Sequence, residues 1–257
     1  MRENVAVPKM SNEHLRYLSK LKQKKFRLQE GLVIVEGKRT LEQLFAWDIK
    51  AKELYIVESE PTVSAAISYT VSEQGMKRLC DSEQPQKIAG LFSLPKPRKI
   101  AFKKAFYLDD ISDPGNLGTI FRIAAAFNID CLILSPKTCE ISSPKVIRAS
   151  LGAVYKVPFF FCEMEKLQEL KAHIFALDMQ GKIPLTNFAP PSEPYIVALG
   201  NEAKGISSSI LKIAEETLCI PMPGEMESLN VSISSAILAY TLAGNEELTK
   251  KGRYRTW

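Results

Sequence analysis

The second half of this 257-residue chain alternates between two patterns of apolar residues. Short runs that are apolar at nearly every position are typical of strands buried on both faces, and longer segments repeat apolar residues at helical spacing. Strands separated by helices in this way predict a parallel sheet covered on both faces. We expect strands at residues 105–109, 131–135, 157–162, 174–178, 195–200 and 218–222, and helices at 117–127, 144–151, 164–172, 208–215 and 230–243.

The first 93 residues have a mixed pattern. It predicts helices at residues 12–28, 39–45 and 72–80 and strands at 32–36, 54–57, 68–71 and 88–92. The segment from Leu94 to Lys99 then places two prolines among basic residues, which disfavours both helix and sheet. The expected organisation is a small mixed α/β domain at residues 1–93, a linker at 94–104 and a second α/β domain at 105–257.

Composition indicates a soluble cytoplasmic protein. Hydrophobic residues make up 46% of the chain, but no apolar run approaches the roughly 18–20 residues that span a bilayer. The N-terminus is charged and does not resemble a signal peptide. The five cysteines are scattered and odd in number, as expected for reduced thiols. With only two histidines, a multi-histidine metal site is excluded, and we expect no metal.

Positive charge is concentrated near the N-terminus. Residues 1–100 contain 18 Lys and Arg against 12 Asp and Glu, whereas the remainder has 34 − 18 = 16 against 29 − 12 = 17. Clustered cations favour a polyanion such as RNA through counterion release. A solvated helix face explains the same charges equally well. The densest cluster comprises Lys20, Lys22, Lys24, Lys25 and Arg27.

Common nucleotide-binding motifs are not found in the sequence. It contains no G-x-G-x-x-G, the fingerprint of dinucleotide folds. Gly200 and Gly205 have the spacing of a P-loop, but Lys204 precedes the second glycine, and Ile206 follows it. A P-loop needs its lysine after that glycine to reach the phosphates, so kinase and NTPase functions are excluded.

Three other motifs each join an expected strand, or the loop after one, to the start of a helix. Their order resembles the SpoU–TrmH family of RNA ribose 2′-O-methyltransferases, of the SPOUT superfamily, over residues 105–244. The segment from Val35 to Arg39 is similar to the ribosomal-protein-like substrate-binding domain of that family. The motifs are residues 113–124 (DPGNLGTIFRIA), 199–206 (LGNEAKGI) and 220–232 (IPMPGEMESLNVS).

The resemblance implies a trefoil knot in the C-terminal domain, S-adenosylmethionine as methyl donor, and a homodimer. Ribosomal RNA is the commoner substrate of two-domain members, with transfer RNA as the alternative. Arg122 would act as base or hold an RNA phosphate, and Glu202 would orient Arg122 or hold the motif loops together. Asn116, Ser228 and Asn230 would position the ribose and Arg122. The donor would contact Leu199, Gly200, Ile220, Met222, Gly224 and Leu229, and RNA would contact the basic cluster with Lys38 and Arg39.

Each site residue also has a plainer interpretation. Asn116 could simply cap a helix that starts at Leu117, and Ser228 and Asn230 could cap the last helix. Arg122 could form a buried ion pair with Glu202, or Glu202 could be a surface carboxylate. Two other function classes stay open: a non-catalytic RNA-binding protein on the same scaffold, and a different α/β enzyme with a nucleotide cofactor.

Overall fold

The computed structural model describes residues 7–57 and 67–250, with side chains up to residue 243. The chain divides into two compact units. Unit 1 comprises residues 1–96 and 140–156, and unit 2 comprises residues 97–139 and 157–257. The first division falls inside the expected linker. The segment from Glu140 to Lys156, expected in the second domain, packs with unit 1 instead.

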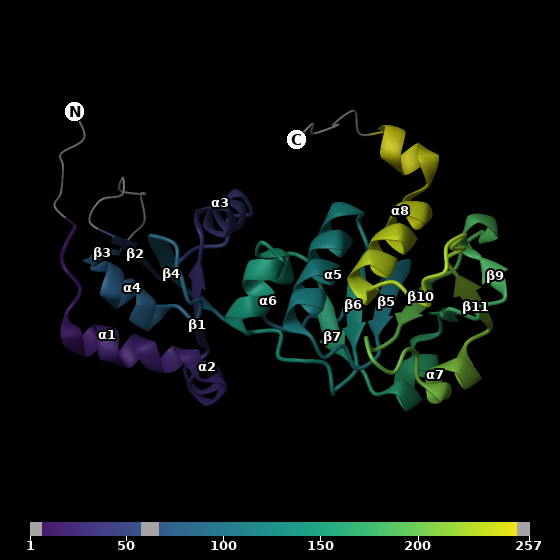
Figure 1. The fold of residues 1–257 in the computed structure, drawn as a ribbon, viewed down its shortest axis with the longest axis horizontal. Coiled ribbons are helices and arrows are strands. Elements are labelled where there is room, and N and C mark those ends of the chain that lie inside the picture. Colours follow the sequence, from purple (N-terminus) through teal and green to yellow (C-terminus); the bar gives the residue numbers. More distant parts are fainter. Residues whose placement is uncertain (1–6, 58–66, 251–257) are drawn as a thin grey trace. The chain divides into compact units, whose positions relative to one another are not determined.

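Unit 1 contains a four-stranded mixed sheet in the order β1-β4-β2-β3 (Figure 1). Strand β4 runs antiparallel to both of its neighbours, whereas β2 and β3 are parallel. The strands are β1 (Leu32–Glu36), β2 (Glu53–Val57), β3 (Ser68–Val71) and β4 (Ile88–Ser93). Helices α1 (Asn12–Ser19), η1 (Lys20–Lys22), α2 (Lys24–Glu30), α3 (Lys38–Ala46) and α4 (Glu73–Leu79) accompany them.

The helix expected over residues 12–28 is broken at Gln23, whose backbone is extended. Arg27 accounts for the break. Its Nη1 atom donates to the carbonyl oxygens of Leu21 and Lys22 at 3.0 and 2.6 Å, and these carbonyls therefore need no partner in a continuing helix. Leu15, Leu18 and Leu21 keep their helical spacing and enter the unit 1 core with Tyr55.

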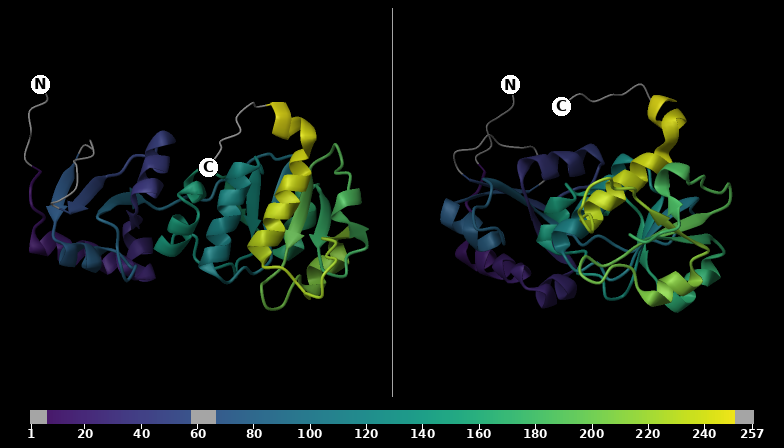
Figure 2. Two further views of the ribbon diagram at one scale, coloured as in Figure 1. Left: turned by 45° about the horizontal axis from the view of Figure 1, so that its top comes forward. Right: turned by 45° about the vertical axis from the view of Figure 1, so that its right-hand side comes forward.

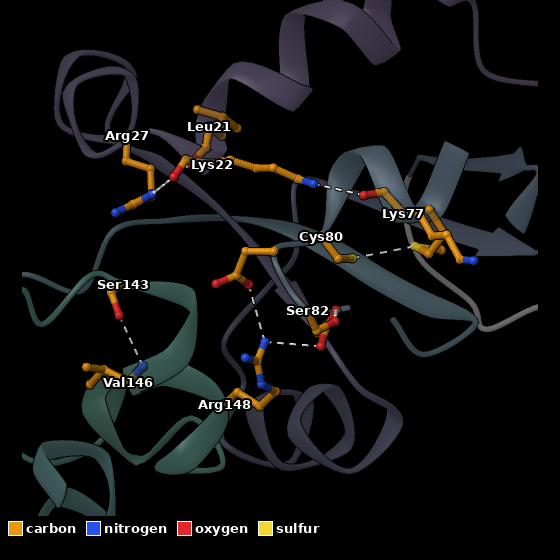
Figure 3. Close-up of polar contacts among 12 residues, drawn as sticks. Leu21, Lys22, Arg27, Lys77, Cys80, Ser82, Ser143, Val146 and Arg148 are labelled. Carbon is orange, nitrogen blue, oxygen red and sulfur yellow. Dashed lines mark hydrogen bonds and ion pairs between the residues drawn. The ribbon is translucent and has the colours of Figure 1, made fainter. Parts of the chain in front are cut away.

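The segment from Glu140 to Lys156, which belongs to unit 1, contains helix α6 (Pro144–Ala149). This helix packs against β1. Two arginine–carboxylate contacts hold the segment, and Figure 3 shows the contact of Arg148. Arg27 meets Glu140 with Nη2 2.8 Å from Oε2, and Arg148 Nη1 lies 3.1 Å from Oε1 of the buried Glu36. Charged groups that are nearly buried need partners. These pairs therefore explain why residues 140–156 pack with unit 1, although the segments before and after them in the sequence belong to unit 2.

Unit 2 contains the expected parallel sheet, with seven strands in the order β7-β6-β5-β10-β8-β11-β9 (Figure 1). All of its pairings are parallel. The two-residue β9 was not expected, because it is too short to form an apolar run. The strands are β5 (Lys104–Leu108), β6 (Cys131–Leu134), β7 (Phe159–Phe161), β8 (His173–Leu177), β9 (Ile183–Pro184), β10 (Tyr195–Leu199) and β11 (Glu216–Cys219).

Helices cover the two faces of this sheet (Figure 2). Alternate strand residues, such as Tyr107 and Ile133, pack with Ile210 of α7 (Ser208–Ile213) and Leu167 of η3 (Met164–Leu170). Helices α5 (Pro114–Ala126) and α8 (Val231–Lys250) pack against each other. The helix expected at 164–172 forms as the 3-10 helix η3.

The trefoil knot stays a prediction. In the described part of the chain, no helix is both long and apolar enough to cross a membrane.

Candidate functional site

The carboxyl ends of β5, β10 and β11 lie at one edge of the parallel sheet. The loops that leave these ends carry the three motifs singled out in the sequence. Ligands of open α/β sheets bind at this edge, because loops from neighbouring strands converge there.

A hydrogen-bonded network centred on Glu202 joins the first two motifs. Its Oε1 atom accepts from Asn116 Nδ2 at 2.9 Å and from the Asp113 backbone N–H at 3.3 Å. Its Oε2 atom accepts from the hydroxyl and backbone N–H of Ser112 at 3.0 and 3.3 Å. One carboxylate thus holds the start of α5 against the loop after β10, as expected for a residue that holds the motif loops together.

The network continues into the third motif through two asparagines. Asn230 Nδ2 donates to Asn116 Oδ1 at 3.0 Å. Asn230 Oδ1 accepts from the backbone N–H and hydroxyl of Ser232 at 2.9 and 2.6 Å. Asn230 therefore both caps α8 and bridges to α5. The cap interpretation of Asn116 is wrong, because Asp113 is the N-cap of α5 and leaves the Asn116 side chain to bridge Glu202 and Asn230.

The network also influences the ionisation of Glu202. Partial burial opposes the charged form, but hydrogen bonds from Asn116 and Ser112 outweigh burial and lower the pKa of the carboxyl group. Glu202 therefore stays ionised at neutral pH and acts only as an acceptor. This charge state is consistent with positioning of neighbouring groups.

Arg122 lies on α5, six residues beyond Asn116, and its side chain is exposed. The interpretation of Arg122 as the ion-pair partner of Glu202 is wrong, since the carboxylate of Glu202 accepts hydrogen bonds from Ser112, Asp113 and Asn116 instead. Among the described residues, no hydrogen bond or ion pair engages the guanidinium of Arg122. An exposed guanidinium without a partner is suited to an anionic ligand such as a phosphate.

Three polar residues of this edge were not singled out from the sequence. Asp109 Oδ2 accepts from the Ser207 backbone N–H at 2.8 Å, and Asn201 Nδ2 donates to the Asp110 carbonyl at 2.7 Å. Asp110 adopts a left-handed conformation with φ of 58°, which Asp tolerates better than most residues. Their position directly after strands was the available signal. They fix the spacing between the loops after β5 and β10.

The expected donor-site residues lie on the same edge but are exposed to different degrees. Leu199 is buried, Ile220 and Met222 are half-buried, and Leu229 is 37% exposed. A Cβ atom added at Gly224 would meet no atom within 4 Å, so the backbone there has open space beside it. Exposed apolar side chains beside accessible backbone fit a ligand with an adenine ring.

Gly200 is required for a reason other than ligand approach. A Cβ atom at this position would lie 2.2 Å from the carbonyl carbon of Gly205 and from the Ile206 nitrogen. The absent side chain of Gly200 therefore lets its own loop close, and the expected contact of Gly200 with the donor stays a prediction. Ser228 is exposed, and no described residue hydrogen-bonds to its side chain.

The basic residues of unit 1 divide into two groups. Arg27 is 4% exposed and fully engaged by Glu140 and two backbone carbonyls, so its expected contact with RNA is replaced by a structural role. The other expected residues are exposed, although Lys22 Nζ donates to the Lys77 carbonyl at 2.8 Å. These exposed residues are Lys20, Lys22, Lys24, Lys25, Lys38 and Arg39. The described residues include no group of three His, Cys, Asp or Glu placed to hold a metal ion.

Comparison with known proteins identifies relatives of both units. Residues 103–240 match the SpoU rRNA Methylase family, and residues 12–90 match the MRM3-like substrate binding domain. A Bacillus subtilis relative, 23S rRNA (guanosine(2553)-2′-O)-methyltransferase RlmP, is 28% identical over 93% of this chain and 99% of its own length. Mouse mitochondrial rRNA methyltransferase 3 is 23% identical over 86% of this chain and 69% of its own length.

Solved structures with a similar fold are also named as RNA methyltransferases, like the sequence relatives. A putative RNA methyltransferase of the TrmH family from Porphyromonas gingivalis has a TM-score of 0.76 and 28% identity, covering 90% of this chain and 97% of its own. An AdoMet-bound rRNA methyltransferase from Sinorhizobium meliloti has a TM-score of 0.77 and 25% identity, covering 91% and 95%. The expected α/β fold is thereby confirmed. Since the family match covers more than half of the chain, this protein belongs to the SpoU rRNA Methylase family.

Proposed function

We propose that this protein transfers a methyl group from S-adenosylmethionine to a ribose 2′-hydroxyl of ribosomal RNA in the cytoplasm. The observation that carries the proposal is the network through Glu202, Asn116 and Asn230, which connects all three motifs at one sheet edge. Arg122 lies on the same helix as Asn116, and its guanidinium has no partner among the described residues. Relatives with ribosomal RNA methyltransferase names favour ribosomal over transfer RNA.

The donor would be held by the loops after β10 and β11. Ile220, Met222 and Leu229 offer apolar contacts to an adenine ring, and Gly224 leaves its backbone groups accessible. When bound, the donor supplies an activated methyl group on a sulfonium, so the protein itself needs no nucleophile. A metal is likewise not required by this chemistry.

The protein's own residues orient the acceptor. Arg122 binds the RNA phosphate next to the target ribose, because a guanidinium stays protonated and is a poor base. Asn116 is held by Glu202 and Asn230, and its amide fixes the position of the ribose. The phosphate oxygen held by Arg122 takes the 2′-hydroxyl proton. Ser228 adds a hydroxyl near the start of α8.

Unit 1 captures RNA by charge. Its exposed lysines and Arg39 contact phosphates without reading bases, which gives affinity rather than sequence choice. Lys38 and Arg39 lie at the start of α3, and Lys20, Lys24 and Lys25 lie on η1 and α2. Substitution of the last three by Gln is expected to raise the KM for RNA and lower its salt dependence.

The α5–α8 pair provides an interface for a homodimer. Ile233 and Tyr240 of α8 are 52% and 59% exposed, although both are large apolar side chains. Phe127, at the end of α5, contacts the Tyr240 ring edge-to-face with centroids 6.1 Å apart. A second copy would cover this surface and leave each RNA site near the seam. Analytical ultracentrifugation should show a dimer at sub-micromolar concentration.

The deciding experiment combines donor binding with mapping of the product. Isothermal titration should show binding of S-adenosylmethionine and no binding of NAD. RNA from a strain that lacks the gene should lose one ribose methylation, and the purified protein should restore it. Donor binding without methyl transfer to any ribosomal RNA would contradict the proposed substrate. RNA binding without donor binding would indicate a non-catalytic protein on the same scaffold.

A further inference from the structure

A second feature lies on the same sheet edge as the Glu202 network, at the carboxyl end of β7. A cavity of about 420 Å³ opens there, wholly within unit 2. Its lining includes Lys99, Phe161, Cys162, Glu163, Lys166 and Glu169. The motifs of the family site contribute none of these residues.

The aromatic side chain at this cavity is unusually accessible. Phe161 is 47% exposed, although its neighbours Phe159 and Phe160 in the same strand are buried. Phe159 contacts the Phe161 ring edge-to-face with centroids 6.4 Å apart, which limits how the exposed ring can turn. A ring that is supported on one side and open on the other is suited to stacking with a planar group.

Charges of both signs surround this ring. Lys99 and Lys166 bring cations, and Glu163 and Glu169 bring carboxylates. Lys99 Nζ lies 5.6 Å above the centre of the buried Phe160 ring, which directs this cation to the cavity. Neither carboxylate forms an ion pair with a described residue. Cations for a phosphate, a ring for a base and carboxylates for base N–H groups together match a nucleotide better than a purely anionic or apolar ligand.

The cavity is connected to the catalytic network through the loop after β6. Cys162 donates its backbone N–H to the Leu134 carbonyl at 2.9 Å, and Ser135 Oγ donates to Asp110 Oδ1 at 2.6 Å. Strand β7 is two strands from β5, so the separation along the edge is about 10 Å. Lys137, whose side chain is 84% exposed, lies on the loop between them. One or two nucleotides of an extended strand cover such a distance.

We infer that this cavity is a nucleotide-binding subsite that stacks a base of the substrate RNA on Phe161, close to the methylated ribose. The inference rests on the proposed function, because the same RNA strand occupies both places. Lys99 and Lys166 contact its phosphates, and Glu163 or Glu169 accepts from the Watson–Crick edge of the stacked base.

The first test separates RNA binding from methyl transfer. Phe161→Ala should raise the KM for ribosomal RNA roughly tenfold, as loss of one stacked base does, while turnover at saturating RNA stays within twofold. Leu211→Ala removes a similarly exposed apolar side chain from α7 and is the matched control. Unchanged affinity for S-adenosylmethionine shows that the variant is folded. If Phe161→Ala does not fold, the double variant Lys99→Gln with Lys166→Gln tests the subsite instead. It should reduce the slope of log affinity for RNA against log salt concentration by about 1.4, because two phosphate contacts are lost.

The second test measures the accessibility of the cavity and requires no methyl transfer. Cys162 lines the cavity and is half-buried, and burial raises the pKa of its thiol. Because iodoacetamide reacts with the thiolate, the labelling is carried out at alkaline pH and followed by peptide mass spectrometry. Ribosomal RNA should slow the labelling of Cys162 several-fold in the wild type, and S-adenosylmethionine alone should not. A wild type that methylates RNA but shows neither protection nor a change in KM would overturn the subsite and leave the proposed function intact. A wild type without RNA methylation would instead refute the function itself.

Discussion

Replacement of Glu202 by Gln tests whether the network serves catalysis. The substitution keeps the shape of the side chain and removes one acceptor oxygen. Each Glu202 oxygen accepts two hydrogen bonds, and both donors at Oε1 are N–H groups. With its amide NH₂ turned toward Ser112, Gln would keep the bonds at Oε1 and could donate to the Ser112 hydroxyl, but the Ser112 backbone N–H would lose its acceptor. The variant therefore loses at least one hydrogen bond and the negative charge that strengthens the others.

The magnitude follows from these bonds. A hydrogen bond to a charged group contributes about 1.5–3 kcal/mol, so the loss of one amounts to about 2 kcal/mol at this accessible edge. If Asn116 must be held in place only in the transition state, the same free energy is expressed in the rate, at about 30-fold in kcat. Donor binding should stay within twofold, because the expected donor contacts come from other residues.

Single-turnover transfer of a labelled methyl group to ribosomal RNA measures this rate. Glu216→Gln is the matched control, since Glu216 is an exposed carboxylate at the start of β11, at the opposite sheet edge. Asn116→Ala combined with Glu202→Gln should cost little more than either change alone, as expected of residues that act as one unit. A kcat for Glu202→Gln within twofold of the wild type would refute the reasoning.

The lowered pKa of Glu202 adds a pH dependence. A depressed carboxyl pKa contributes stability that is present above the unfolded value, here 4.5, and is lost as pH falls through the folded value. The difference in stability between the wild type and Glu202→Gln should therefore be largest near neutral pH and shrink below about pH 4.5. Urea denaturation at several pH values measures it, and a difference that grows on acidification would contradict the assigned sign.

Three further changes probe the remaining assignments. Arg122→Ala should lower methyl transfer at least about 10²-fold with unchanged donor affinity in titration calorimetry, because the phosphate clamp is lost; near-normal turnover would leave Arg122 without a catalytic role. Gly224→Val should retain the wild-type melting temperature yet abolish donor binding, whereas Gly200→Ala should lower the melting temperature; equal effects of both would contradict the roles given to the two glycines. Arg27→Met should destabilise unit 1 by about 3–5 kcal/mol in urea denaturation, since it removes the positive charge that pairs with Glu140 and leaves this carboxylate only its hydrogen bond from Ser142; a loss below 1 kcal/mol would show that the pair is dispensable.

Much of the fold follows from local patterns. Strands such as β5 and β10 are buried on both faces and consist almost entirely of apolar residues, so their positions can be predicted without knowledge of their neighbours. The order of strands and helices then leaves few arrangements besides a parallel sheet. The carboxyl ends of parallel strands share one edge, so the three motif loops could be expected to converge, whereas the choice of Asn116, Glu202 and Asn230 came from the family resemblance.

The tertiary structure decided what depends on contacts between distant residues. Arg27 looks like a member of a cationic cluster, but Glu140, 113 residues away, turns it into a buried structural residue. Gly200 was expected only as a donor contact, but the close approach of Gly205 and Ile206 shows why a side chain cannot be accommodated at this position. The exposed ring of Phe161 lies in a run that reads as wholly buried.

The sequence alone therefore determined the positions of most strands and helices of the parallel sheet, because these depend on local spacing and on burial averaged over a segment. Only the tertiary structure decided the partner of each charged group, the break at Gln23 and the packing of residues 140–156 in unit 1. The physical reason is that a buried charge or a close backbone approach is stabilised by one particular distant group, and no local pattern encodes which group that is.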